Sequence, residues 1–336
     1  MNGKENIPFS QEEKDNPQRL FNLSLFGKER TYGIIRMAEP TADFSFPDYP
    51  DKTKPHHIEI DPFGEIIKST PLNFKPINTL DEPINISHTE DDRSTPDGSL
   101  HGVTAVLNNH TWYPAVYKKT DDSWGEEINL RVFDRLEPGK NALPIKREEE
   151  AFLLYRPEHI PQEIWGYQLE ENSLELKSNP EPFFVWHFLP AWWSERRIGL
   201  VSEGFPLNNG KKEEFLPVHG QYYDQANNIC YALGGCVAKV GINSEIKLLA
   251  HPFLTPQALE EVVGRKLPQA IPGKLIVYSC GSLKKDDHFE MAVSVGDSWT
   301  FYLKTPWPEI EEYIYSEGNC LPSWQLVWEL KAKKDH

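Results

Sequence analysis

The stretch GVTAVLNNHTWYPAVYKK, from Gly102 to Lys119, is rich in β-branched and aromatic residues and is divided by Asn108 and Asn109. β-Branched and aromatic side chains are enriched in strands, and adjacent asparagines between such runs indicate a turn. The stretch therefore predicts two strands joined by a turn, and it sets the pattern that the rest of the chain repeats.

A third candidate strand, EINLRVFDRL, begins at Glu127 and places Ile128, Leu130 and Val132 on one face. Further apolar segments of strand length follow from Ser173 to Lys331. Helical signals are few. TPQALEEVVGRKL (255–267) starts with a Thr-Pro pair suited to a helix N-terminus, and WPEIEEYIY (307–315) predicts a second short helix.

Candidate strands outnumber candidate helices more than twofold, and turn signals recur at intervals of roughly ten residues. This pattern predicts a mainly β, β-rich α+β fold, an antiparallel sandwich or barrel-like core with a few short helices. The pieces WYPAV, LPAWW and LPSWQ recur at uneven spacing. A propeller is expected to repeat at a fixed period, so the spacing argues against one.

The amino-acid composition of the chain changes near residue 100. Residues 1–100 are rich in Pro, Asp, Asn and Thr and predict a partly irregular N-terminal region, followed by a β-rich main domain over 101–336. Within the first region HHIEIDPFGEIIK (56–68) predicts a hairpin, and HTEDDRSTPDGS (88–99) predicts a solvated loop. The charged start of residues 146–171 favours a helix, but two prolines would interrupt it.

The 336-residue chain has 51 acidic and 35 basic residues, a formal net charge of −16. Binding of nucleic acid depends on neutralising phosphates with Lys and Arg, so we expect no nucleic-acid partner. No apolar run approaches the ~18 residues of a membrane span, and the first residues show no secretory signal. We therefore expect a cytoplasmic protein.

The four cysteines, at positions 230, 236, 280 and 320, lack the spacing of a redox or zinc motif and predict reduced thiols. His57, Glu59 and Asp61 would share one face of a strand, where a metal is geometrically possible, but no distant fourth ligand can be named. We expect neither a metal nor a cofactor.

Aromatic residues make up 12% of the chain, which has ten tryptophans. Many gather in FFVWHFLPAWWSERR, residues 183–197. Tryptophan is frequent at binding surfaces because its N–H requires a partner. The leading interpretation is a non-catalytic cytoplasmic binding protein, such as an acidic inhibitor of a basic partner, which engages a protein or an apolar small molecule. Its predicted binding residues are Phe184, Trp186, Trp192, Trp193, Arg196 and Arg197.

Two apolar runs end in His219-Gly220 and Cys280-Gly281, within EEFLPVHGQ and GKLIVYSCGSL. This arrangement resembles the caspase-like and gingipain-like cysteine peptidases. The resemblance covers about residues 215–285 and implies a cysteine-dependent hydrolase with His219 as base and Cys280 as nucleophile. Those folds alternate strands with helices, whereas residues 228–253 predict strands alone. Whether the protein is an enzyme therefore stays open.

Overall fold

The computed structural model describes residues 19–27, 31–38, 53–107, 111–119, 124–147, 150–177, 181–207, 213–239, 245–267, 274–296 and 299–330. The described strands form five sheets, and each sheet contains strands that are near one another in the sequence. Almost all neighbouring strands are antiparallel, because short turns connect them. The prediction of a mainly β protein with few helices is confirmed.

From the innermost strand outward, the first sheet consists of β1 (Arg19–Phe26), β2 (Thr31–Ala38), β3 (Thr53–Ile60) and β4 (Ile66–Pro71). The second consists of β6 (Ile86–Ser94), β7 (Leu100–Leu107), β8 (Thr111–Lys118), β9 (Glu127–Val132) and the parallel strand β5 (Asn73–Ile77). The third consists of β10 (Gly139–Arg147), β11 (Glu150–Pro157) and β12 (Glu163–Glu170), which pairs with both β13 (Glu175–Leu176) and β14 (Phe184–His187).

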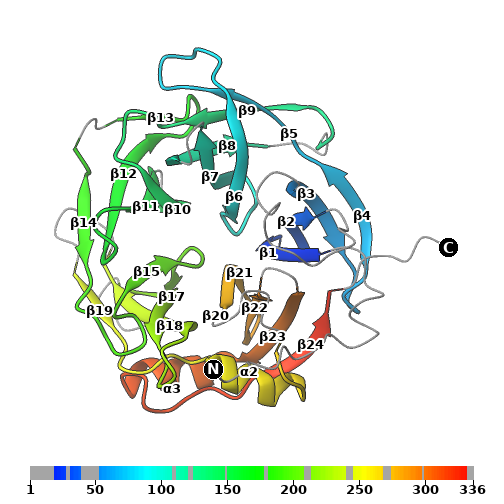
Figure 1. The fold of residues 1–336 in the computed structure, drawn as a ribbon, viewed down its shortest axis with the longest axis vertical. Helices are drawn as coiled ribbons and strands as arrows, with labels where there is room; N and C mark the ends of the chain where they lie inside the picture. The colour runs from blue at the N-terminus through cyan, green and yellow to red at the C-terminus, as the bar shows by residue number, and fades with distance from the viewer. Residues whose placement is uncertain are drawn as a thin grey trace, which may run out of the picture.

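The fourth sheet has β15 (Arg197–Leu200), β17 (Glu214–Tyr223), β18 (Ile229–Ala238) and β19 (Ile246–Leu248), with the short strands β16 (Phe205–Pro206) on β17 and β20 (Lys274–Leu275) on β18. The fifth has β21 (Val277–Lys285), β22 (His288–Val295), β23 (Trp299–Pro306) and β24 (Gln325–Glu329). Figure 1 shows the five sheets around a common centre, with β1, β6, β10, β15 and β21 innermost. This arrangement is a five-bladed β-propeller.

The expectation that uneven spacing excludes a propeller is wrong. The innermost strands begin at residues 19, 86, 139, 197 and 277, so the blades differ in length. The extra residues lie outside the four-stranded part of a blade, in added strands, loops and helices. A propeller requires each blade to present a similar inner strand and to pack on its neighbours, and it does not require a constant sequence period.

Each interface between neighbouring blades buries its own apolar cluster. Side chains of the third and fourth blades, including Leu143, Trp186 and Leu216, share one cluster. The ring closes between the first and last blades, where Leu23 and Ile35 pack with residues of β22 to β24. Burial of about 25 cal/mol per Å² of apolar surface at every interface stabilises the ring as a unit.

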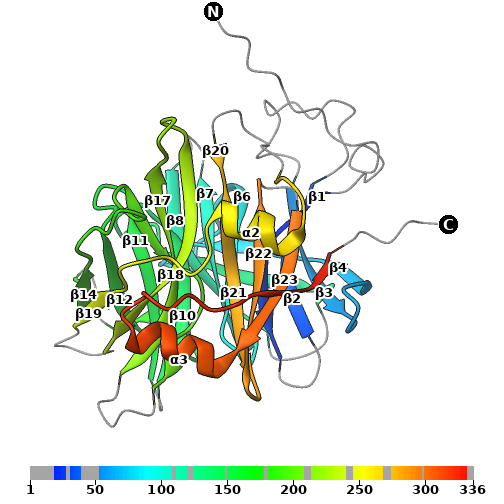
Figure 2. The same ribbon diagram turned by 90° about the horizontal axis from the view of Figure 1, so that it is seen from below.

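Two helices cover the outer side of the fourth and fifth blades (Figure 2). α2 (Pro256–Val263) begins after Thr255, whose hydroxyl accepts a hydrogen bond from the Ala258 N–H at 3.2 Å. α3 is Trp307–Tyr315. Both helices are predicted correctly from the sequence, and their buried faces join the apolar cluster that includes Phe215 and Phe289.

Several local predictions concern segments that the structure describes. The hairpin at 56–68 is confirmed as β3–β4, and the strand at Glu127 is confirmed as β9. The predicted helical start within 146–171 is wrong, because this segment is the β11–β12 hairpin. The predicted loop at 88–99 is also wrong over most of its length, since it supplies β6. The boundary drawn at residue 100 coincides with the start of β7, which pairs with β6.

The first and last blades approach each other closely at Gly281. A Cβ atom there would collide with the backbone nitrogen of Leu25 and with Ser24. We predict that Gly281→Ala lowers the free energy of unfolding by about 1–3 kcal/mol, because the backbones cannot separate without disturbing the ring closure. Gly125→Ala is the control, since among the described residues the one atom within 4 Å of a Cβ there is Thr70 Cγ2, at 3.7 Å. Equal denaturation midpoints for the two variants would contradict this role of Gly281.

Candidate active site on the propeller axis

Four of the five innermost strands carry a β-bulge. The register shifts lie between Phe21 and Ser24, Glu90 and Arg93, Lys140 and Leu143, and Tyr278 and Gly281. In three of these bulges one residue has a left-handed backbone: Asn22 (φ 56°), Asp91 (φ 56°) and Asn141 (φ 63°). Asn and Asp tolerate this conformation better than most residues. Since a bulge redirects side chains, these polar groups meet side chains of other blades at the axis.

Asn22 and Asp91 join the first two blades. Asn22 Nδ2 donates a hydrogen bond of 2.9 Å to Asp91 Oδ1. Asn22 is 3% exposed, and its Oδ1 is buried without a hydrogen-bond partner among the described residues. Asp91 is partly exposed, so one carboxylate at the axis is both oriented by a neighbour and open to a ligand.

Arg93 crosses the axis and contacts every blade except the first. Its Nε donates to the Leu200 carbonyl at 2.9 Å, and its terminal nitrogens donate to the Asp91 carbonyl at 2.8 Å and to Asn141 Oδ1 at 3.2 Å. It also hydrogen-bonds the Tyr278 hydroxyl. The side chain is fully buried. Because its donors are already engaged, Arg93 organises the site and is not available to grip a substrate.

Asn141 determines which nitrogen of His219 carries the proton. Asn141 Oδ1 accepts from Arg93 and from the Tyr278 hydroxyl (3.1 Å), so its Nδ2 must face His219 Nε2, 3.5 Å away. A nitrogen that faces a donor must be the acceptor, which leaves the hydrogen on Nδ1. That atom is buried with no partner among the described residues. Burial, and then the charges of Arg93, Arg156 and Arg197, hold the pKa of His219 well below its usual range. The imidazole is therefore a neutral donor.

Two further arginines lie between the third and fourth blades. Arg156 is 3% exposed and donates to the Ile198 carbonyl at 3.3 Å. Burial, and then the neighbouring charge of Arg197, lower the pKa of Arg156. Within the described ranges neither guanidinium forms an ion pair with a carboxylate closer than 4 Å, although Glu158 acts on Arg156 from farther away. Two neighbouring cations without a close counterion among the described residues create positive potential that favours an anion.

A charged cluster lies beside this centre. Glu90, next to Asp91, accepts from Lys140 Nζ at 3.2 Å and hydrogen-bonds His88 at 3.1 Å. Burial alone would raise the pKa of Glu90, but His88, Lys140 and Arg36 together lower it below its usual range. Lys140 also stands 4.0 Å above the ring of Trp112. These contacts fix the bulges of β6 and β10, from which Asp91 and Asn141 extend.

Asp92 supports the centre from the side of the first two blades. It accepts from the Tyr117 hydroxyl at 2.7 Å and from Ser24 at 3.4 Å. Ser24 and His101 are in turn linked through Ser94. All of these side chains are buried, so Asp92 is held rigidly next to Asp91.

The structure brings the two residues of the predicted dyad near the axis but does not make them a catalytic pair. His219 is engaged by Asn141. Cys280 is 1% exposed, and its burial raises the pKa of the thiol far above its ordinary value, in spite of the opposing effect of Arg93. A nucleophilic cysteine needs a lowered pKa and access to substrate. The glycines that follow the two residues of the dyad are also enclosed: Gly220 packs against Trp193, and Gly281 packs against β1.

The predicted binding residues do not form a continuous surface. Phe184, Trp186 and Trp193 are buried between the third and fourth blades. Trp193 donates to the Leu249 carbonyl at 3.2 Å. Trp192 is 51% exposed, as expected for a position beyond the strand end. Arg196 lies over the Tyr223 ring, whereas Arg197 belongs to the axial arginine pair.

Two properties concern the described part of the chain as a whole. No group of three or more His, Cys, Asp or Glu side chains there could hold a metal ion. His57, from the strand face where a metal was geometrically possible, is stacked on Trp124 with ring centroids 4.1 Å apart. Neither described helix has the length and apolar composition needed to cross a bilayer.

The residues that sequence reasoning missed are those of β6 and the bulges. The sequence predicts a loop at Asp91, Asp92 and Arg93, because seven polar residues, 89 to 95, follow His88 without an apolar alternation. No local signal marked these residues as a strand, because an inner propeller strand that faces a polar axis needs no apolar alternation.

No protein-family model matches the chain, and no curated protein does. Solved structures do. The β-1,2-mannobiose phosphorylase from Listeria innocua, in complex with β-1,2-mannobiose, is 13% identical, and the match covers 92% of this chain and 95% of that chain with a TM-score of 0.59. A glycosyl hydrolase from Bacteroides ovatus is 10% identical over 87% and 85% of the two chains (TM-score 0.49). A mannose phosphorylase from Leishmania mexicana in complex with phosphate is 13% identical over 95% and 90% (TM-score 0.48).

The likeness over nearly the whole chain places the protein in the same fold as carbohydrate-active propeller enzymes. The leading interpretation as a non-catalytic, protein-binding inhibitor is wrong, and so is the alternative of a caspase-like or gingipain-like hydrolase. Both relied on local segments. The blades show that the tryptophan-rich segment is mostly interior packing and that the Cys280 strand belongs to an antiparallel sheet.

The thiols provide a direct check of this correction. We predict that Cys320, which is exposed, reacts rapidly with an alkylating agent, whereas Cys230, Cys236 and Cys280 react only after denaturation. Mass spectrometry at pH 7 would map the labelling, and His219→Ala should leave the rate at Cys280 unchanged. Labelling of Cys280 as fast as that of Cys320 in the native protein would contradict the buried, inert thiol.

The stability of the protein is expected to depend on pH through Glu203. Arg147 forms ion pairs with both Glu203 and Glu214. Burial raises the pKa of Glu203 to about 7, although Arg147 acts against this shift. The folded protein then binds a proton more tightly than the unfolded chain. We predict that the free energy of unfolding falls as the pH rises from about 4.5 to 7, by at most about 1.4 kcal/mol per pH unit. Urea denaturation of Glu203→Gln should lack this component, whereas the exposed-site variant Glu126→Gln should keep it.

Proposed function

We propose that the protein is a carbohydrate-active enzyme that cleaves a glycosidic bond at the propeller axis, with inorganic phosphate as the acceptor. The observation that carries the proposal is the pair of Arg156, which is buried, and Arg197, which is partly exposed, without a close counterion among the described residues. Tyr278 acts on Arg156 and hydrogen-bonds Arg93, two residues after the partly exposed Asp91. The fold likeness to a β-1,2-mannobiose phosphorylase supports it.

The basic groups suit phosphate for geometric and energetic reasons. Guanidinium groups bind phosphate oxygens in a bidentate manner, and burial strengthens this interaction. The neutral His219 adds an N–H that lacks a partner among the described residues, and a phosphate oxygen would satisfy it. A nucleophile held by three donors is presented in one orientation, which is a large part of what an enzyme needs for a displacement.

We assign the role of proton donor to Asp91, because its carboxyl group is partly exposed at the axis and is oriented by Asn22. In phosphorolysis the bond between the anomeric carbon and the bridging oxygen breaks, while a phosphate oxygen forms a new bond to that carbon. The leaving oxygen takes the proton of the Asp91 carboxyl group, and the carboxylate is reprotonated from solvent. Asn22 fixes the rotamer of Asp91 through a 2.9 Å hydrogen bond and acts as a positioning residue.

We predict that the protein converts β-1,2-mannobiose and inorganic phosphate to mannose and mannose 1-phosphate. Asp91→Asn should lower kcat by about 10²–10⁴, the usual contribution of a general acid. Arg156→Gln should raise the KM for phosphate with less effect on the disaccharide. Asp286→Asn and Arg135→Gln, both at exposed positions, are the matched controls.

Calorimetric titration with inorganic phosphate tests the acceptor independently of the sugar. Wild-type protein should bind phosphate, and Arg156→Gln should lose this binding. If mannose is released from the disaccharide at the same rate without phosphate, the reaction is hydrolysis and the proposed phosphorolysis is wrong. Phosphate binding that is absent in the wild type, or unaffected by Arg156→Gln, would overturn the assignment of the arginine pair.

A further inference from the structure

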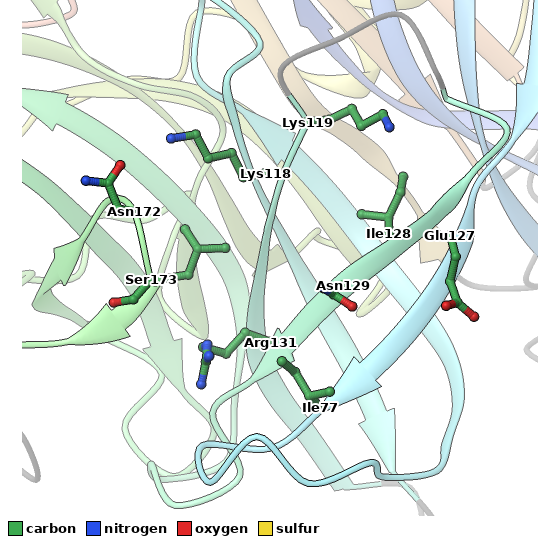
Figure 3. Close-up of a pocket in the computed structure, with 10 residues that line it drawn as sticks. Ile77, Lys118, Lys119, Glu127, Ile128, Asn129, Arg131, Asn172 and Ser173 are labelled. Atoms are coloured by element: carbon green, nitrogen blue, oxygen red, sulfur yellow. The ribbon is translucent and has the colours of Figure 1, made fainter.

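A cavity away from the axis opens at the outer rim between the second and third blades. Its volume is about 330 Å³, and its walls come from β5, β8 and β9 of one blade and from the turn before β13 of the next (Figure 3). Cavities of a few hundred Å³ accommodate small organic molecules. None of the residues that line it takes part in the axial network.

The cavity concentrates positive charge on a protein with a net charge of −16. Its lining includes Lys118, Lys119 and Arg131 against one carboxylate, Glu127. Figure 3 shows the side chains of Lys118 and Arg131 extending toward the turn with Asn172 and Ser173. Elsewhere the acidic surface repels anions, so this local excess of cations selects for an anionic ligand.

Arg131 gives a second, independent indication. The residue is 8% exposed, and its NH2 donates to Asp81 at 2.6 Å. Its NH1 is buried and has no hydrogen-bond partner among the described residues. A buried donor without an acceptor costs about 1–3 kcal/mol, which an oxygen of a ligand in the cavity would offset.

The existing ion pairs are weak competitors. The partner of Arg131, Asp81, is 63% exposed, and the partner of Lys118, Glu171, is 39% exposed and 3.6 Å away. Glu171 is also bound more closely by Lys146, at 2.9 Å. The partly exposed pair of Lys118 and Glu171 contributes about 0–1 kcal/mol, whereas a dianion between Lys118 and Arg131 gains from both cations.

The remaining walls suit a sugar. Ile77, Ile128 and Leu174 provide apolar surface beside the cations, and Asn129, Asn172 and Ser173 provide amide and hydroxyl groups. A monosaccharide ring has an apolar face and polar hydroxyls. We propose that this cavity is a second ligand site that binds a phosphorylated monosaccharide, with its phosphate between Lys118, Arg131 and Ser173. This inference does not depend on the function proposed for the axis.

Calorimetric titration of the full-length protein with mannose 6-phosphate tests the site, with mannose and glucuronate as comparison probes. Lys118→Glu should weaken binding at this site by about tenfold or more, since it replaces attraction by repulsion at a position that is 27% exposed. Ser173→Ala should weaken it by a smaller factor. Lys68→Glu is the control, because Lys68 is an exposed lysine outside the lining of the cavity.

A variant of an axial arginine distinguishes binding in this cavity from binding at the axis. Binding of mannose 6-phosphate that survives Arg156→Gln but is lost in Lys118→Glu supports the peripheral site, whatever the activity at the axis. Binding that is lost only in Arg156→Gln would overturn it. If glucuronate binds as tightly as mannose 6-phosphate, the site does not select phosphate over carboxylate, and the proposed ligand class is wrong. If mannose binds as tightly, the cations of the cavity do not contribute to binding, and the proposal is also wrong.

Discussion

The guanidinium of Arg93 is the interaction on which the centre of this propeller depends. It lies at the axis with no exposed surface, and its hydrogen bonds reach the Asp91 carbonyl of its own blade, the Leu200 carbonyl, Asn141 and Tyr278. A buried charge is tolerated only when its donors are satisfied, so each of these acceptors must hold its position. The blades around Arg93 are therefore fixed relative to one another by one side chain.

This constraint explains the chemistry of the groups around it. Asn141 accepts from Arg93, so its amide must turn its N–H toward His219. Gly199 leaves the space that these two side chains occupy, because a Cβ there would collide with both. Burial, and then the charges of the nearby arginines, lower the pKa of His219 and keep it neutral. Arg156 and Arg197 form a region of positive potential within an acidic protein. Asp91, one residue from Asp92 and two from Arg93, is the carboxylate that the same bulge leaves accessible.

The β-bulges of the inner strands bring the polar side chains to the axis. A regular inner strand would alternate its side chains between its two faces, and a single register shift reverses that alternation. At Asn22, Asp91 and Asn141 the shift coincides with a left-handed backbone. Polar groups of three blades thus converge on one place, while apolar residues before and after them still reach the interfaces between blades. The same device supports both the packing of the ring and the polar axis.

The sequence by itself determined the mainly β class, both helices and many of the strands, because these follow from local periodicity and capping, as at Thr255 and at Ile128. It also directed attention to His219 and Cys280, although for a different reaction. The number of blades, the bulges and the meeting of Asn22, Asp91, Arg93 and Asn141 were decided by the tertiary structure alone. These residues are far apart in the chain. Polar segments such as theirs predict loops from the sequence, and only the packing of five blades shows that they lie on inner strands. Only closure of the ring buries Arg93 and Asn141 and brings each of them to hydrogen-bond partners in other blades.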